Sequence, residues 1–483
     1  MTDNRRNWLA LYTLCLGTLM IVLDTTIVNV ALPSIRTSLG FSQTSLAWVI
    51  NAYMLTFGGL LLLGGRLGDL FGHRRLFIAG IGLFTASSAA CGLSTSEGML
   101  IAARAVQGVG GAVASAVGLS LVMTLFTEPA DRAKAMGISG FVASGGGAIG
   151  VLLGGILTDA LNWHWIFLVN LPIGVVVSVL AFRLVPADHI SGTRGRIDVA
   201  GAVTVTAALM LAVDAIVNGN QDGWLSARTD GLLGAAVALL ATFVVIESRV
   251  AEPLMQLRLF KLRNLAGANA VGVLWAGGMF AWFFLSSLYM QRVLGYSPLQ
   301  VGLAFLPPNL IMGAFSIGLA AKLTMRFGIR LPLVTGLLLA ATGLALLGRA
   351  PVGGSFAADI LPSMILLGFG AGIAFTPVLL AAMSDVQPQE AGLASGLVNT
   401  SFMMGGALGL AVLASAAASR TSSLHAGGAG QLAALTGGYH VAFLAGAGFA
   451  ALGAVVAGIV LRTRPMAAPS HALEGEEYDA VAA

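Results

Sequence analysis

Long apolar runs separated by short polar breaks recur along the whole chain. Each run has about 20 residues, the length that an α-helix needs to cross roughly 30 Å of hydrocarbon. The runs are far longer than the strands of a membrane barrel and do not alternate, so they predict helices. The predicted spans are residues 9–31, 46–66, 76–95, 98–125, 135–158, 165–185, 199–218, 231–248, 265–290, 299–321, 331–349, 358–383, 392–418 and 438–461.

Composition supports the same class of protein. Of the 483 residues, 57% are hydrophobic and 10% are charged, whereas soluble domains carry about 25% charged residues. The chain is therefore predicted to be an all-α polytopic membrane protein. The net charge of +4 is scattered over loops and does not indicate a nucleic-acid partner. Cys15 and Cys91 both lie in apolar runs and show neither a disulfide framework nor metal-ligand spacing.

Basic residues are distributed unequally between the two sides of the predicted membrane. With these spans, 19 lysines and arginines fall on the side of the amino terminus and five on the other, and Arg104 lies inside a span. Because basic loops remain in the cytoplasm, both termini are predicted to be cytoplasmic. The first run, Trp8 to Val30, is too long for the core of a signal peptide, so we interpret it as a retained helix.

Short sequences repeat at a constant offset. LGFS at Leu39–Ser42 recurs as LGYS at Leu294–Ser297, and RLGDLFGHR at Arg66–Arg74 recurs as KLTMRFGIR at Lys322–Arg330. Paired halves of this kind are typical of secondary transporters, which bind substrate between the halves near the midplane. The predicted organisation is a six-helix half at 8–185, two inserted helices with linkers at 186–264, a second six-helix half at 265–462, and a disordered cytoplasmic tail at 463–483.

An aspartate stands inside the first span, in LDTTIVNVALPSI at Leu23–Ile35. A carboxylate at the centre of a span costs about 2.5–3.5 kcal/mol on insertion scales, so Asp24 should face a partner or a polar cavity. Arg104, in LIAARAVQGVGG, is the other charge firmly inside this half. An aspartate beside an arginine is held ionised, and one left alone in apolar surroundings retains a proton. Asp24 and Arg104 are therefore predicted to couple protons to transport; the alternative is a static ion pair that fixes helix packing.

The segment GRLGDLFGHRR forms the short connection between the second and third spans. Its glycines allow a tight turn, and its acid and bases can form contacts that exist in one conformation only. We predict a cytoplasmic gate; the alternative is a purely topogenic basic loop. The proposed gate residues are Gly65, Asp69, Gly72, Arg74 and Arg75.

Two further sets of residues are candidates for function. In SGGGAIGVLLGG, glycines spaced by four predict a stripe for close helix packing, here Gly146, Gly150 and Gly154, with Gly155 beside it. Polar or polarizable residues within the spans are candidates for a substrate cavity, although such residues also serve in packing or face lipid. They are Asn29, Gln107, Asn309, Asn399 and Met403.

These motifs together resemble the major facilitator superfamily, and within it the fourteen-helix drug:proton antiporters. GRLGDLFGHRR is similar to the loop 2–3 signature, LDTTIVNVALPSI to the helix 1 signature, and RAVQGVGG to the helix 4 signature. WHWIFLVNLPIG resembles the junction of helices 5 and 6 in this branch, and the resemblance covers residues 8 to 462. The chain departs from the pattern at Val151, where the antiporter signature of helix 5 has proline, and at His164, where the junction has arginine.

The resemblance implies a multi-pass exporter of the bacterial inner membrane that expels small hydrophobic or amphipathic compounds, such as drugs and antibiotics, by alternating access. Protons and a small-molecule substrate are the expected partners, with a candidate periplasmic adaptor in a double-membraned cell, and a monomer is expected. The proton gradient drives the cycle, so no cofactor or metal is implied. The residues offer no catalytic group, so an enzyme is not expected. A proton-coupled uptake symporter and a non-transporting receptor or assembly subunit remain alternatives.

Overall fold

The computed structural model describes residues 3–186, 198–250, 253–387 and 390–462, and the predicted disordered tail lies outside these ranges. Within them the regular structure is helical throughout. The amino-terminal helices are α1 (Asp3–Leu39), η1 (Ser45–Ala47), α2 (Trp48–Phe71), α3 (His73–Gly92), α4 (Glu97–Leu125), α5 (Pro129–Ala160), α6 (Trp165–Leu168) and α7 (Asn170–Leu184).

The remaining helices form an intermediate pair and a second bundle. The pair is α8 (Val199–Asp222) and α9 (Ala227–Arg249), followed by the short η2 (Leu257–Lys261). The bundle contains α10 (Arg263–Arg292), α11 (Pro298–Ala304), α12 (Leu306–Ala314), η3 (Phe315–Leu319), α13 (Ala320–Phe327), α14 (Arg330–Leu347), η4 (Phe356–Ile360), α15 (Leu361–Met383), α16 (Ala391–Ala426) and α17 (Gln431–Val460).

Thirteen of the predicted spans are helices long and apolar enough to cross a membrane. The predicted span 299–321 is instead divided into α11, α12, η3 and the start of α13. Pro307 and Pro308 follow the first break, and proline has no N–H for a helical hydrogen bond. At the second break η3 is a π-helix, and Gly318 there has φ +113°. Local backbone chemistry, rather than a lack of apolar residues, therefore interrupts this span.

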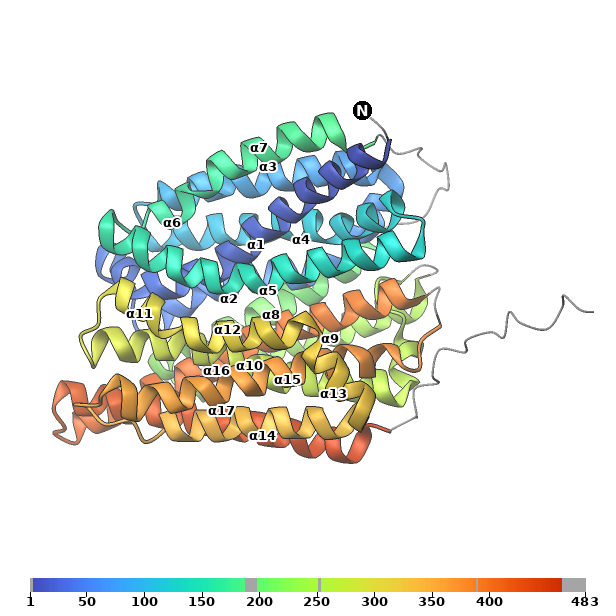
Figure 1. The fold of residues 1–483 in the computed structure, drawn as a ribbon. Helices are drawn as coiled ribbons and strands as arrows, with labels where there is room; N and C mark the ends of the chain where they lie inside the picture. The colour runs from blue at the N-terminus through green and yellow to red at the C-terminus, as the bar shows by residue number, and fades with distance from the viewer. Residues whose placement is uncertain (1–2, 187–197, 251–252, 388–389, 463–483) are drawn as a thin grey trace, which may run out of the picture.

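Two bundles lie one above the other with their helices roughly along a common axis (Figure 1). In the first, α4 packs between α2 and α3, while α1 contacts α5 and α7. In the second, α10 packs against α16 and α17, and α14 against α15 and α17. The amino terminus lies at the right-hand end of Figure 1, so the loops after α2, α9 and α15 share that end.

The two bundles turn in the same way at the repeated motifs. Gly40 and Gly295, in LGFS and LGYS, have φ +78° and +72°. Gly72 and Gly328, in the longer repeat, have φ +93° and +75°. A residue with a Cβ is strained in this left-handed region. The glycines of the repeat therefore reverse the chain at matching positions in each bundle.

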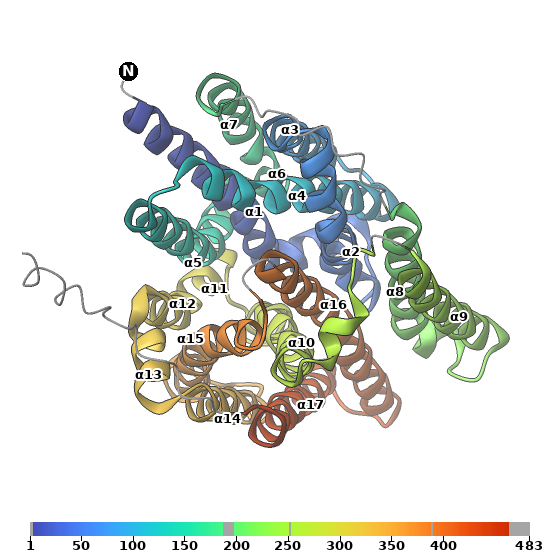
Figure 2. The same ribbon diagram turned by 90° about the vertical axis from the view of Figure 1, so that its right-hand side faces the viewer.

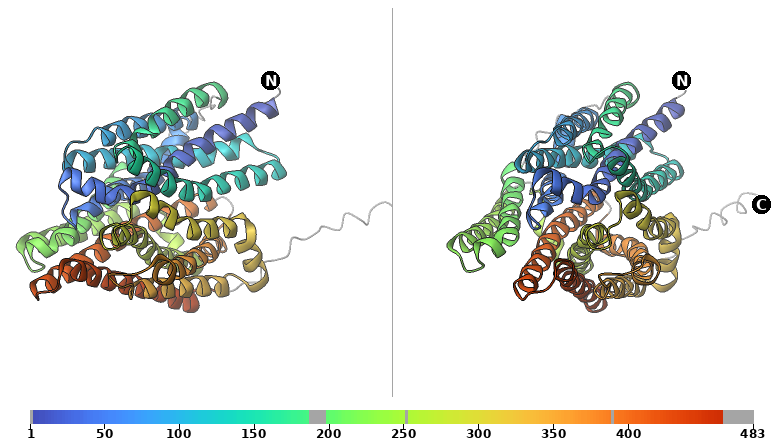
Figure 3. Two further views of the ribbon diagram at one scale, coloured as in Figure 1. Left: turned by 60° about the vertical axis from the view of Figure 1, so that its left-hand side comes forward. Right: turned by 90° about the vertical axis from the view of Figure 1, so that its left-hand side faces the viewer.

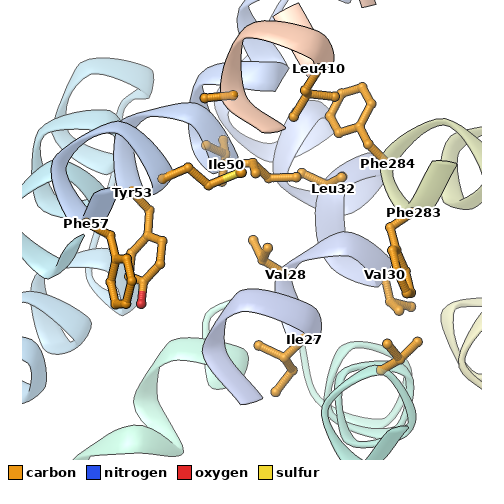
Figure 4. Packing of buried hydrophobic residues seen from close by; sticks show 14 of the residues in the cluster. Ile27, Val28, Val30, Leu32, Ile50, Tyr53, Phe57, Phe283, Phe284 and Leu410 are labelled. Carbon is orange, nitrogen blue, oxygen red and sulfur yellow. The ribbon is translucent and has the colours of Figure 1, made fainter. Parts of the chain in front are cut away.

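Two hydrogen bonds join the bundles toward the end away from the termini. The Ser287 hydroxyl of α10 donates to the Asn29 carbonyl of α1 at 2.7 Å, and the Gln291 amide donates to the Val30 carbonyl at 2.8 Å. Apolar side chains of the same two helices also meet: Figure 4 shows Phe283 of α10 next to Val30 of α1. These contacts hold α1 against α10.

Helices α8 and α9 pack against each other at the edge of the molecule (Figures 2 and 3). Only α8 makes extensive contact with the bundles, through α2 on one side and α16 on the other. The Asn220 amide of α8 donates to the Ser415 carbonyl of α16 at 2.8 Å. The inserted pair thus bridges the two bundles without belonging to either packing core.

Candidate functional site

Asp24 and Arg104 form an ion pair inside the first bundle. Arg104 Nη1 lies 2.5 Å from Asp24 Oδ2, and the two side chains are 1% and 0% exposed. The carboxylate comes from the middle of α1 and the guanidinium from the second turn of α4. Sequence reasoning therefore identified both partners. The pair thus ties the middle of α1 to the start of α4.

Neutral polar groups complete the surroundings of the carboxylate. Gln107 Nε2 donates to Asp24 Oδ1 at 2.8 Å, and Asn170 Nδ2 donates to the same oxygen at 3.1 Å. Both amides also donate to the Ser88 hydroxyl, at 3.1 and 3.0 Å. Ser88 in turn donates to the Phe167 carbonyl at 2.9 Å. Helices α1, α3, α4 and α7 are thereby connected through one buried network.

Arg104 has acceptors other than Asp24. Its Nε donates to the Val49 carbonyl at 2.9 Å, and Nη1 also donates to Gln107 Oε1 at 2.7 Å. The guanidinium carbon lies 4.5 Å from the centroid of the Tyr53 ring and 5.6 Å from that of Phe167. Aromatic faces attract cations by about 0.5–2 kcal/mol. The arginine therefore keeps favourable contacts even without its acid.

Glycines bring α2 and α4 close enough for this arrangement. A Cβ added at Gly108 would lie 2.5 Å from the Tyr53 carbonyl oxygen, and one at Gly111 would lie 2.9 Å from the Tyr53 hydroxyl. Such distances leave no room for a side chain. RAVQGVGG thus supplies both the charged group and the smooth surface on which Tyr53 rests.

A hollow of about 450 Å³ lies nearer the end that carries the termini. Pockets of about 300–1,000 Å³ accommodate drug-sized molecules. Its walls come from α2, α4, the segment before η2 and the start of α16. The lining residues are Leu61, Leu62, Gly65, Arg66, Asp69, Ser115, Ala116, Leu119, Ser120, Pro253, Leu254, Gln256, Glu390, Gly392, Leu393, Ser395, Gly396 and Asn399.

The predicted gate residues divide between this hollow and the neighbouring helices. Gly65 and Asp69 line the hollow, and Asp69 Oδ1 lies 3.3 Å from His73 Nε2. Gly72 makes the left-handed turn between α2 and α3. Arg74 donates to the Phe182 carbonyl of α7 and lies over the Phe182 ring, whereas Arg75 is exposed.

The glycine stripe of α5 packs on the helix that carries Asp24. A Cβ at Gly146 would lie 3.0 Å from Val22 Cγ1, one at Gly150 would lie 3.0 Å from the Leu23 carbonyl oxygen, and one at Gly154 would lie 2.6 Å from that of Ile27. Gly155 faces the other bundle: a Cβ at this position would lie 2.7 Å from the Pro298 carbonyl oxygen. Helix α5 therefore contacts both bundles through one glycine-rich segment.

Val151, which replaces the proline of the antiporter signature, is fully buried in α5. This helix runs unbroken from Pro129 to Ala160. Gly302 of α11 packs against the Val151 carbonyl oxygen, which would lie 3.0 Å from a Cβ at position 302. The segment thus forms a tight joint between the bundles.

The residues predicted for a substrate cavity do not gather in one place. Asn399 lines the hollow, while Gln107 lies in the Asp24 network. Asn29 and Asn309 are 5% and 6% exposed, and each donates to carbonyls of its own helix. Met403 packs against α2 at Gly58.

Sequence reasoning missed Ser88 and Asn170 altogether. Neither residue carries a charge, and Ser88 stands in a run of small residues that reads as ordinary helix packing. One signal was available for Gln107: it follows Arg104 by three positions, which places both side chains on one face of a helix. Asn170 offered a weaker signal as the amide in WHWIFLVNLPIG, next to the break between α6 and α7.

Comparison with known proteins identifies the class of protein. The model of the Major Facilitator Superfamily matches residues 14–410, and the chain belongs to this family of membrane transporters. A crystal structure of the nucleoside transporter NupG matches with a TM-score of 0.65 at 12% identity, covering 94% of this chain and 100% of that one. At this identity the likeness concerns the fold alone.

Relatives of known name are more similar in sequence. The puromycin resistance protein pur8 of Streptomyces alboniger is 39% identical over 469 residues, covering 96% of this chain and 93% of its own. The cephamycin export protein CmcT of Amycolatopsis lactamdurans is 41% identical over 418 residues, covering 86% and 85%. The multidrug resistance protein Stp of Mycobacterium tuberculosis is 36% identical over 420 residues, covering 87% and 78%.

Proposed function

We propose that this multi-pass transporter exports small hydrophobic or amphipathic compounds, antibiotics among them, in exchange for protons. The relatives named for puromycin resistance and cephamycin export support the class of substrate. The proposal that protons are exchanged rests on Asp24, because this titratable carboxylate is buried, together with Arg104, in the middle of a span. A monomer opening its hollow to the cytoplasm is the expected working form.

Proton binding at Asp24 would change the forces between α1 and α4. A neutral carboxyl group loses its attraction to Arg104, which keeps the Val49 carbonyl, Gln107 and two aromatic faces. The acid is therefore the mobile partner and the arginine the fixed one. Release of the tie would free α1 to move relative to α4, and deprotonation would restore it.

Two helices connect this change to the hollow. In α2, the Val49 carbonyl accepts a hydrogen bond from Arg104, and residues between Leu61 and Asp69 of the same helix line the hollow. Helix α4 carries Arg104 and lines the hollow from Ser115 to Ser120. In the cycle we propose, Asp69 meets the start of α16 when the hollow closes, and the two stand apart across the hollow when it is open.

Inside-out vesicles with an acid lumen provide the test. Puromycin, a cephamycin and lincomycin would be added singly while a lumenal dye reports the pH gradient. We expect some compound to dissipate the gradient with the natural chain but not with Asp24→Asn. The control is Asp214→Asn in α8, which alters an intramembrane acid bonded only to Asn218 in the described structure.

Two results would contradict the proposal. In one, no compound dissipates the gradient; in the other, Asp24→Asn behaves like the natural chain. A proton-coupled uptake symporter is distinguished by the side of addition, because it would move protons out only when substrate is loaded inside these vesicles. A receptor or assembly subunit would show no substrate-dependent proton movement from either side.

A further inference from the structure

Two acids at the base of the inserted pair are buried far from the Asp24 network. Among the described residues, Asp198 and Glu247 are 5% and 4% exposed, and with Asp24 and Arg104 they are the charged residues that are fully buried. Asp198 caps α8, where its Oδ1 accepts from the Gly201 amide at 2.7 Å. Glu247, near the end of α9, accepts from the Met255 amide through Oε2 at 3.0 Å.

The second oxygen of each acid has no hydrogen-bond donor. Asp198 Oδ2 and Glu247 Oε1 are both inaccessible to solvent and without a hydrogen bond in the described structure. They also lie against one point: a Cβ at Gly201 would be 2.5 Å from Asp198 Oδ2 and 2.9 Å from Glu247 Oε1. Two adjacent ionised carboxylates repel each other when buried, and one proton between them removes the repulsion.

Glu247 also holds a segment that walls the hollow. The hollow is lined by Pro253, Leu254 and Gln256. Between them, the Met255 amide donates its hydrogen bond to Glu247. Leu254 packs with Leu63 of α2 and Ala202 of α8. Figure 2 shows this yellow-green segment before α10 lying beside α16 on the face that carries the termini. We call residues 253–261, which end with η2, the linker.

We propose that Asp198 and Glu247 hold one proton between Oδ2 and Oε1, and that this proton keeps the linker seated against the hollow. When the proton passes to water, the two carboxylates separate and Glu247 withdraws from the Met255 amide. The wall of the hollow then loosens on one side. The shared proton stands independently of drug export, whereas its effect on transport rests on the proposed function.

Other charged groups near the pair are compatible with one shared proton. Arg258 and Lys261 of η2 line a shallow outer hollow together with Glu247, and Arg258 is paired with Glu390 at the start of α16. On the other side of Leu254, Arg66 and Asp69 of α2 line the hollow of about 450 Å³. A singly protonated pair carries one negative charge, and the nearby charge of Arg258 is already balanced by Glu390.

Infrared spectroscopy of the full chain in liposomes tests the shared proton directly. We expect a band from a protonated carboxyl group at neutral pH that is lost in Glu247→Gln and in Asp198→Asn. It should persist in Asp230→Asn, which alters an acid in the first turn of α9. A spectrum with no such band, or a band unchanged in both variants of the pair, would overturn the proposal.

A spin label reports the linker. With Cys15 and Cys91 replaced, the label at Gln256→Cys should become more mobile as the pH rises. In Glu247→Gln it should stay immobile, because the amide donates to Asp198 while its oxygen still accepts from Met255. In Asp198→Asn the new amide would donate to Glu247 instead, so this variant gives the same test if Glu247→Gln does not fold. If the mobility of the label depends on pH equally in the natural chain and in both variants, the shared proton does not hold the linker in place. Neither readout needs a substrate, so each remains interpretable if export fails.

Discussion

The two bundles share their turns but differ in what fills them. The first contains the Asp24–Arg104 pair with its amides. Among the described residues of the second bundle, α10 to α17, no charged side chain is fully buried. Its interior instead packs aromatic rings, such as Trp282 against Phe305 at 5.8 Å between centroids. A repeated fold can therefore bury charged groups in one half and leave the interior of the other half uncharged.

The same contrast appears in the repeated loop. By the offset of the repeat, Asp69 of the first bundle corresponds to Met325 of the second, and Met325 is 64% exposed. Both loops retain the glycine that reverses the chain, Gly72 and Gly328. Both bundles therefore have the turn, whereas only the first has the acid at this position. The following variants test whether function divides in the same way.

The largest effect is expected from Asp24→Asn. The amide keeps the shape of the side chain but cannot release a proton, so drug-dependent proton movement should fall by at least about 100-fold, or roughly 2.7 kcal/mol in barrier terms. Drug binding to the purified protein checks that the site remains folded. Retained coupling in this variant would remove the distinction between the bundles.

Gly154→Leu should come next, because it breaks the surface on which α1 rests. Its Cβ would lie 2.6 Å from the Ile27 carbonyl oxygen, so helix α1 must shift. Overpacking typically costs about 1–3 kcal/mol, and thermal unfolding in detergent should show a lower Tm. Gly145→Leu is the matched control, since nothing lies within 4 Å of a Cβ added at that position. Equal Tm values for the two variants would contradict the packing argument.

Trp282→Leu tests the uncharged interior of the second bundle. Trp282 is 1% exposed and lies 4.4 Å from Phe283 between ring centroids. Removing part of a buried ring should cost about 1–3 kcal/mol of stability and lower the Tm. The ratio of protons to drug should stay unchanged, because no titratable group is altered. A changed ratio, measured in vesicles, would show that coupling extends into the second bundle.

The smallest effect is expected from Asp69→Asn. An exposed charge contact is worth about 0.2–1 kcal/mol, so the rate of export should fall by about fivefold or less while drug binding is retained. Met325→Leu, at the corresponding position of the second bundle, should leave the rate unchanged. Stopped-flow measurement of drug movement distinguishes the two variants. Equal slowing by both would mean that the loops act symmetrically.

Much of the architecture was predictable from the sequence because helices that span a membrane must be long and apolar throughout. Thirteen spans followed directly from this constraint. The span at 299–321 was predicted as continuous and is broken, since proline and a left-handed glycine act on the backbone without changing the apolar character of the run. The glycines of GRLGDLFGHRR likewise predicted the tight turn between the second and third spans, which Gly72 makes.

Charges inside the spans were also visible in the sequence, because an unpaired charge in hydrocarbon is too costly to be accidental. Asp24 and Arg104 were paired on this basis, and the structure places them in contact. Only the tertiary structure revealed Ser88 and Asn170 as neutral partners, and it placed Gln107, a candidate for the substrate cavity, beside Asp24.

The Asp198–Glu247 pair shows the same limit at the base of the inserted helices α8 and α9. In sequence, Asp198 is a helix cap and Glu247 is one acid near the end of a helix, and acids at such positions are ordinarily solvated. Their burial results from the packing of α8 on α9 and from the return of the linker over both. Hydrophobicity and its period are properties of the chain, whereas the neighbours of a polar atom exist only after the chain has folded.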